Sequence, residues 1–186
     1  MTAVFVDTNV LVYARDASEP AKQAVAAEWL RELWAEQRGR TSVQVLSEYY
    51  TTVTSKLRPG LPADDAWEDV TALFAWEPQN IDRHVLARAR EIERRHSLSW
   101  WDSMIVAAAQ LQNCDTLLSE DLQNGWVCGA VIIRNPFVDR VEEDRQDYAA
   151  TLAPVSRHRR PGRPARKSKS LRGRSQTAAA RSAVQE

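Results

Sequence analysis

The feature of this 186-residue chain that most restricts its fold is the alternation of short strand-like runs with longer helical stretches. Four runs have the length and flanking residues of strands: 4–6, 40–42, 116–118 and 131–133. Around them, helices are expected over 10–14, 18–37, 43–57, 64–74, 82–96 and 100–112, with Ser18 as the N-cap of the second. This order predicts a three-layer α/β/α domain with a mainly parallel central sheet.

The charge of the chain is divided between two segments, although the total is zero. Residues 1–150 carry 15 Lys and Arg against 24 Asp and Glu, a net charge of −9, whereas residues 151–186 carry 10 against 1, a net of +9. The second segment is too poor in large apolar residues to offset the entropy lost on ordering. We therefore predict a folded domain over residues 1–140, followed over 141–186 by an acidic linker and a disordered basic tail.

The sequence contains neither a membrane span nor a secretory signal that we can identify. No apolar run approaches the roughly 18 residues that a membrane-spanning helix needs. The N-terminus lacks the basic and apolar regions of a secretory signal, so we expect a cytoplasmic protein. Because Cys114 and Cys128 do not have the spacing of metal ligands, both are expected to be reduced thiols in the core. The seven tryptophans are expected to lie mostly in the core as well.

Four acidic residues lie beside segments that should be buried: Asp7, Glu48, Asp102 and Asp121. Asp7 and Asp121 follow strands, at the carboxyl ends where open parallel sheets bind ligands. Asp102 lies in the first turn of an apolar helix, on a face that should point to the core. Glu48 lies on the flank of the apolar stripe of its helix. These positions suggest one shared site.

Each acid also has a simpler explanation. Asp7 and Asp121 could serve only as helix caps or first-turn acids. Asp102 could form a capping box with Ser99, a role that is compatible with a place in a site. Glu48 alone would be read as a solvated helical residue. Only the combination of the four carries the prediction.

Four carboxylates in one site would repel one another unless a cation neutralised them. Oxygen ligands without Cys or His favour Mg²⁺ or Mn²⁺. The matching chemistry is phosphodiester hydrolysis, in which bound metals activate a water and stabilise the leaving oxygen. No G-x-S-x-G, P-loop or G-x-G-x-x-G motif points to another reaction.

The spacing of these motifs resembles that of PIN-domain ribonucleases, and most closely the VapC toxins of type II toxin–antitoxin pairs. The similar segments cover about residues 1–137 and are Val4–Leu11, Ser47–Glu48, Leu98–Ala109, Cys114–Leu122 and Asn135–Phe137. Asn113 stands where the family often has Gly, and Asn tolerates the left-handed backbone that Gly would provide. Ser119 stands where the family often has Thr, and it keeps the hydroxyl.

The resemblance implies an endoribonuclease that cuts RNA with Mg²⁺ or Mn²⁺ as its cofactor. It also implies a homodimer and inhibition by a VapB-like antitoxin. By the same resemblance Asp7, Glu48, Asp102 and Asp121 take the catalytic roles, with Asp7 and Asp102 as metal ligands. Asn9 and Ser119 resemble the polar residues that support such a site.

Two questions stay open at the level of sequence. One alternative is a non-catalytic RNA-binding or partner-binding protein on a PIN-like fold, although a degenerate copy would be expected to lose some of the four acids. The tail could contact RNA phosphates or the acidic body, or be solvated without a specific role. The residues that would bind RNA are Arg159, Arg160, Arg163, Arg166 and Lys167.

Overall fold

The computed structural model describes residues 2–138 of the chain. The predicted linker and basic tail, with Arg159, Arg160, Arg163, Arg166 and Lys167, lie outside the described residues. The domain boundary near residue 140 and the roles suggested for the tail therefore stay predictions.

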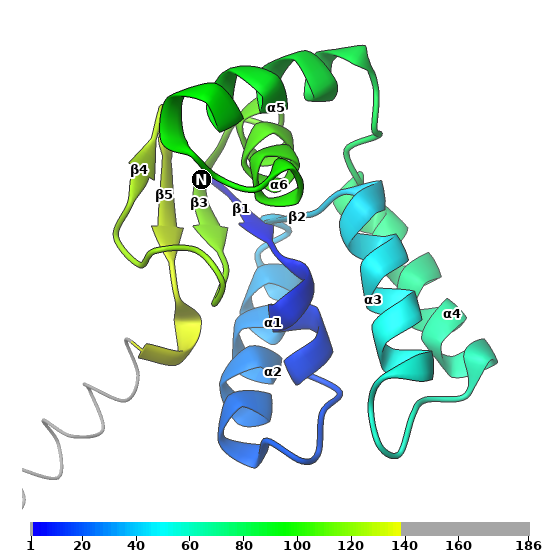
Figure 1. Ribbon diagram of the computed structural model, residues 1–186. Coiled ribbons are helices and arrows are strands. Elements are labelled where there is room, and N and C mark those ends of the chain that lie inside the picture. The colour runs from blue at the N-terminus through cyan, green and yellow to red at the C-terminus, as the bar shows by residue number, and fades with distance from the viewer. Residues whose placement is uncertain (1, 139–186) are drawn as a thin grey trace, which may run out of the picture. The chain divides into compact units, whose positions relative to one another are not determined.

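The described residues form strands and helices in the order that the sequence predicts, with one additional short strand, β4 (Figure 1). The strands are β1 (Ala3–Val6), β2 (Gly39–Arg40), β3 (Cys114–Leu118), β4 (Val127–Cys128) and β5 (Val131–Arg134). The helices are α1 (Thr8–Tyr13), α2 (Pro20–Ala35), α3 (Val43–Ser55), α4 (Ala63–Leu73), α5 (Arg83–His96) and α6 (Trp100–Leu111), with a 3-10 turn over Phe74–Trp76.

The sheet has the strand order β2-β1-β3-β5-β4. All neighbouring strands run parallel except β4, which pairs antiparallel with β5. Helix α6 packs against β3 and β5, and α5 packs against α6, while α1 contacts both α2 and α3. The predicted α/β fold with a mainly parallel sheet is confirmed.

Four helices begin at side-chain caps that the residue types favour, and the cap of α1 by Asp7 is described with the site below. The Ser42 hydroxyl accepts from the backbone N–H of Val45 at the start of α3, and the Asp82 carboxylate caps α5. Ser99 caps α6, as predicted. The cap predicted for α2 is wrong, because Ser18 instead donates to the Asp16 side chain and the helix begins one residue later.

The core is built around β1 and α6. Phe5 and Val6 are fully buried in the middle of the sheet, and residues 103–109 of α6 are all buried. The stripe predicted on α3 is also buried at Val45, Tyr49 and Val53. The two cysteines are free and buried, as expected. Of the described helices, none has the length and apolar character needed to cross a membrane.

The parallel register sets the residues that follow β1 and β3 side by side. Val6 pairs with Leu118, and the backbone N–H of Asp7 donates to the Leu118 carbonyl at 3.0 Å. The backbone N–H of Ser119 donates in turn to the Arg134 carbonyl of β5. At Asn113, just before β3, φ is 54°, the left-handed conformation that the sequence predicts. The carboxyl edge of the sheet therefore presents Asp7 next to Ser119.

Candidate functional site

Asp7 is the buried centre of the polar cluster at this edge, with only 8% of the residue exposed. One carboxylate oxygen, Oδ1, accepts from the backbone N–H of Thr8 at 2.7 Å, so Asp7 does cap α1. The other, Oδ2, accepts from the Ser119 hydroxyl at 2.7 Å and from the Asn9 amide at 3.4 Å. The capping role and the place in the cluster are thus compatible.

Burial raises the pKa of Asp7 from 3.8 to about 6. The hydrogen bonds from Ser119 and Thr8 act in the opposite direction, because they stabilise the charged form. The nearby carboxylates of Asp121 and Glu48 raise the pKa further by repulsion. The site is therefore one in which a negative charge is costly unless a cation balances it.

Asn9 and Ser119 connect Asp7 to Asp121. The Asn9 amide donates to Asp121 Oδ2 at 3.1 Å, and its carbonyl oxygen accepts from the backbone N–H of Glu120 at 3.3 Å. The Ser119 hydroxyl oxygen accepts from the backbone N–H of Asp121 at 3.3 Å. These contacts fix the turn after β3 against the start of α1. Both residues lie where a role in supporting the carboxylates requires them.

Glu48 reaches the same cluster from α3. Its Oε2 accepts from the Thr8 hydroxyl at 3.0 Å, and its Oε1 accepts from the Gln44 amide at 3.1 Å. Although Glu48 is exposed, these two contacts aim its carboxylate toward the residues that follow β1. Glu48 is therefore solvent-exposed, as its position alone would suggest, and it also lines the cavity.

Asp102 reaches the cluster from the first turn of α6 and is half-buried. Its Oδ2 accepts from the Ser99 hydroxyl at 2.7 Å, and its backbone N–H donates to the same hydroxyl oxygen at 3.1 Å. The contact with Ser99 predicted from the sequence is therefore present. This contact orients the carboxylate through Oδ2. The other oxygen, Oδ1, accepts no hydrogen bond from residues 2–138.

A cavity of about 420 Å³ brings the four carboxylates together. It is lined by Asp7, Thr8, Asn9, Val12, Tyr13, Asp16, Gln44, Glu48, Thr52, Trp101, Asp102, Ile105, Glu120 and Asp121. Of the four acids, only Asp7 is buried, whereas Glu48 and Asp121 are exposed. The energetic cost of burial expected for all four acids therefore applies in full to Asp7 alone. Asp16 and Glu120 add two further carboxylates that the sequence did not assign to the site.

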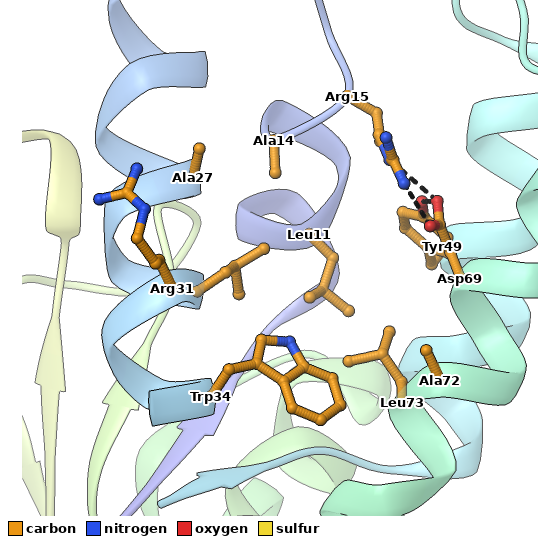
Figure 2. Close-up of a pocket in the computed structure, with 11 residues that line it drawn as sticks. Leu11, Ala14, Arg15, Ala27, Arg31, Trp34, Tyr49, Asp69, Ala72 and Leu73 are labelled. Carbon is orange, nitrogen blue, oxygen red and sulfur yellow. Dashed lines mark hydrogen bonds and ion pairs between the residues drawn. The ribbon is translucent and has the colours of Figure 1, made fainter. Parts of the chain in front are cut away.

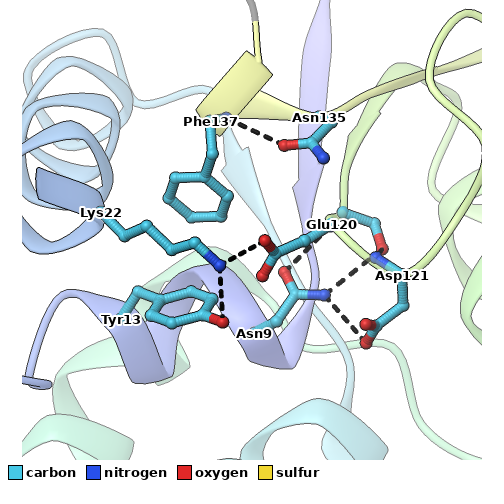
Figure 3. Close-up of polar contacts among 8 residues, drawn as sticks. Asn9, Tyr13, Lys22, Glu120, Asp121, Asn135 and Phe137 are labelled. Atoms are coloured by element: carbon cyan, nitrogen blue, oxygen red, sulfur yellow. Dashed lines mark hydrogen bonds and ion pairs between the residues drawn. The ribbon is translucent and has the colours of Figure 1, made fainter. Parts of the chain in front are cut away.

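Glu120 is not among the site residues predicted from the sequence, although it directly precedes Asp121. It lines the cavity, and its carboxylate forms an ion pair with Lys22 of α2 (Figure 3). The Lys22 ammonium also donates to the Tyr13 hydroxyl at 2.9 Å and lies 4.3 Å from the centre of that ring. Phe137 packs edge-on against Tyr13 at 5.0 Å. Lys22 thus neutralises Glu120. Within residues 2–138, none of the other five carboxylates that line the cavity forms an ion pair with a basic side chain.

A second cavity, of about 310 Å³, lies beside Leu11 between side chains of α2 and α4 (Figure 2). Its lining is mainly apolar and includes Leu30, Trp34 and Leu73. Its one carboxylate, Asp69, pairs with Arg15 and accepts from the Tyr49 hydroxyl at 2.5 Å. Because this carboxylate is already neutralised, the second cavity is not a candidate metal site.

The donor set of the acidic cavity fits a hard divalent cation, since all candidate ligands are oxygens and neither Cys nor His is among them. In this structure, no three Asp, Glu, His or Cys side chains among residues 2–138 converge tightly enough to form a ready metal group. The reason is visible in the contacts: Asp7, Glu48 and Asp102 each turn toward a neighbouring donor.

Comparison with known proteins agrees with the geometry. A comparison with curated proteins found none that matches the chain. Among solved structures, the crystal structure of VapC20 from Mycobacterium tuberculosis, described as a sarcin–ricin loop cleaving toxin, is similar at a TM-score of 0.50 and 22% identity. The match covers 64% of this chain and 92% of that chain, and at this identity it shows the fold. A family model described as PIN domain matches residues 4–123, and the chain therefore belongs to the PIN domain family.

Proposed function

We propose that this protein is a metal-dependent endoribonuclease that hydrolyses RNA phosphodiester bonds, and that it acts as the toxin of a VapBC toxin–antitoxin pair. The observation that carries the proposal is that Asp7, Glu48, Asp102 and Asp121, from four separate segments, line one cavity. Membership of the PIN domain family supports nuclease activity, and the likeness to VapC20 supports the comparison with toxins.

In this proposal Asp7 and Asp102 hold Mg²⁺ or Mn²⁺, and Glu48 and Asp121 complete the acidic lining. Such a cation supplies Lewis-acid activation of water and neutralises charge on the phosphate oxygens. The positive charge of a bound cation would offset the burial that raises the pKa of Asp7, and so would favour the ionised form that can act as a ligand. Asn9 and Ser119 hold Asp7 and Asp121 in fixed orientations, so that the carboxylates need not be ordered again at each turnover.

The partners follow from the same proposal. RNA is the substrate, a VapB-like antitoxin is the inhibitor, and the protein works as a homodimer in the cytoplasm. Two aromatic side chains are exposed on α4 and in the 3-10 turn that follows it, Trp67 at 54% and Phe74 at 51%, and their rings pack against each other. They form an apolar patch suited to another protein chain.

The proposal is tested by incubating purified protein with total cellular RNA in Mg²⁺ or Mn²⁺, with and without EDTA. We expect discrete cleavage products with metal, none with EDTA, and recovery when metal is added in excess. The Asp7→Asn variant, purified in parallel, controls for contaminating nucleases. If neither metal supports cleavage of any RNA, or if the variant cuts as well as the wild type, the alternative of a non-catalytic RNA-binding or partner-binding protein takes its place.

A further inference from the structure

Trp101 has the largest exposed fraction, 60%, among the exposed large hydrophobic residues between positions 2 and 138. Trp76 is buried and three other tryptophans pack against the core, but Trp101 does not follow the expectation that the tryptophans lie mostly in the core. Leaving most of an indole in water forfeits part of the roughly 25 cal/mol gained for each Å² of apolar surface buried. Folding therefore does not explain the position of this ring.

The ring lies at the acidic cavity. Trp101 is a lining residue and directly precedes Asp102 in the first turn of α6. Its neighbour Trp100 packs against the core, so the two indoles of this turn have different environments. The Trp101 carbonyl accepts from the Gln44 amide at 3.5 Å, and the same amide donates to Glu48. The backbone of Trp101 is thus tied to the wall of the cavity while its ring remains accessible.

The cavity offers a polyanion very little attraction from side-chain charge. Six of its lining residues are carboxylic acids, and none is Lys or Arg. Lys22, the cation beside it, is already paired with Glu120. The side chains that line the cavity therefore give a phosphate no cationic partner, and any affinity for RNA that this lining adds comes from an interaction that does not depend on side-chain charge. Stacking of a nucleobase on an aromatic ring is such an interaction.

We propose that the Trp101 indole stacks on an unpaired RNA base next to the phosphate held at Asp102. This inference rests on the proposed ribonuclease function and adds a base-binding subsite to it. Stacking needs a base that is not engaged in a helix, so the subsite selects single-stranded or loop regions. Because every base has a stacking face, it selects for strandedness more than for sequence.

The test measures binding separately from cleavage. In the cleavage-deficient Asp7→Asn background with Mg²⁺, the affinity for a fluorescent pool of short single-stranded RNA is compared between Trp101 and Trp101→Ala. The loss of a stacking partner is expected to weaken binding by roughly 5-fold to 100-fold. Trp101→Phe, which keeps an aromatic face, should retain most of the affinity.

Trp67→Ala is the matched control. Trp67 is exposed to a similar extent, 54%, but lies on α4 against Tyr50 and Phe74 and does not line the cavity. The Trp67→Ala variant should leave RNA affinity unchanged. Circular dichroism of each variant shows whether the fold is retained, and the conservative Trp101→Phe variant keeps the test valid if Trp101→Ala is unstable.

An abasic oligomer of the same length distinguishes stacking from other roles of the ring. Removing the bases should weaken binding to Trp101 protein, and Trp101→Ala should then cause little additional loss. Equal losses on both oligomers, or an effect no larger than that of Trp67→Ala, would overturn the proposal. An altered oligomeric state with unchanged RNA affinity would instead assign Trp101 to a protein interface. Failure of cleavage in metal, measured independently, would count against the nuclease function and not against base binding.

Discussion

Replacing Asp7 by Asn is expected to reduce metal-dependent RNA cleavage by at least about 100-fold, since the loss of even an outer-shell partner of a metal costs about 10-fold to 100-fold. The substitution preserves shape and one acceptor oxygen, so the hydrogen bond from the Thr8 N–H can persist. What it removes is the negative charge at the buried centre of the acidic cavity. The cleavage rate at saturating RNA, measured against Mg²⁺ concentration, checks this expectation.

The same substitution should stabilise the metal-free protein at neutral pH. The pKa of Asp7 is about 6 in the folded protein and 3.8 without the fold, so between these values the folded state holds a proton that the unfolded state has lost. Stability of the metal-free wild type therefore falls as pH rises through this window, by up to about 3 kcal/mol at 1.36 kcal/mol for each unit. Asn carries no charge and escapes this loss.

Urea unfolding in EDTA, at pH 4 and at pH 7.5, separates this effect from all other titrating groups. The variant and the wild type should have similar free energies of unfolding at the lower pH, where Asp7 is protonated. At the higher pH the variant should be more stable, and Mg²⁺ should narrow the difference by stabilising the wild type alone. A less stable variant at pH 7.5 would mean that the hydrogen bonds to the charged carboxylate outweigh its burial.

Asp102→Asn is expected to abolish cleavage to a similar degree while changing stability little. Asn can still accept from the Ser99 hydroxyl, and the loss of a charge near the helix N-terminus costs about 0.3–1 kcal/mol. Ser99→Ala is the matched control for Asp102→Asn. It removes the cap of α6 and should cost about 1 kcal/mol, yet it leaves the carboxylate in place.

Cleavage rates and thermal unfolding of the two variants together separate the two roles of this turn. We expect Asp102→Asn to be folded and inactive, and Ser99→Ala to be less stable and still active within about 10-fold. If Asp102→Asn unfolds, or if Ser99→Ala loses as much activity as Asp102→Asn, then Asp102 acts through the helix cap and not through a cation.

The parts of the fold and site that could be predicted are those set by local chemistry. A buried three-residue run ending in Asp7 predicts both a strand and a carboxylate at its carboxyl end. Ser99 before an apolar helix predicts the cap of α6 together with the orientation of Asp102. Asn113, where the resembling family often has Gly, adopts the left-handed backbone that Asn tolerates. In each case the residue type and its immediate neighbours contain the whole physical cause.

The missed features depend on residues far apart in the sequence. The pairing of Glu120 with Lys22 joins positions 98 residues apart, and nothing local at Glu120 predicts it. Strand β4 has two residues, one of them exposed, and exists only because β5 offers an edge to pair with. Trp101 lines a cavity built from several segments of the chain, so its place beside that cavity cannot be predicted from its neighbours in the sequence.

The sheet order has a consequence for the time at which the site comes into being. Strand β1 lies between β2 and β3, and Asp7 meets Ser119 across 112 positions of the chain. During synthesis, β1 is made before both strands that flank it. It can pair with β3 only after the chain has been translated through about residue 118. Asp121, the last of the four acids, arrives later still. The acidic cavity therefore cannot be complete until the chain has been synthesised through Asp121.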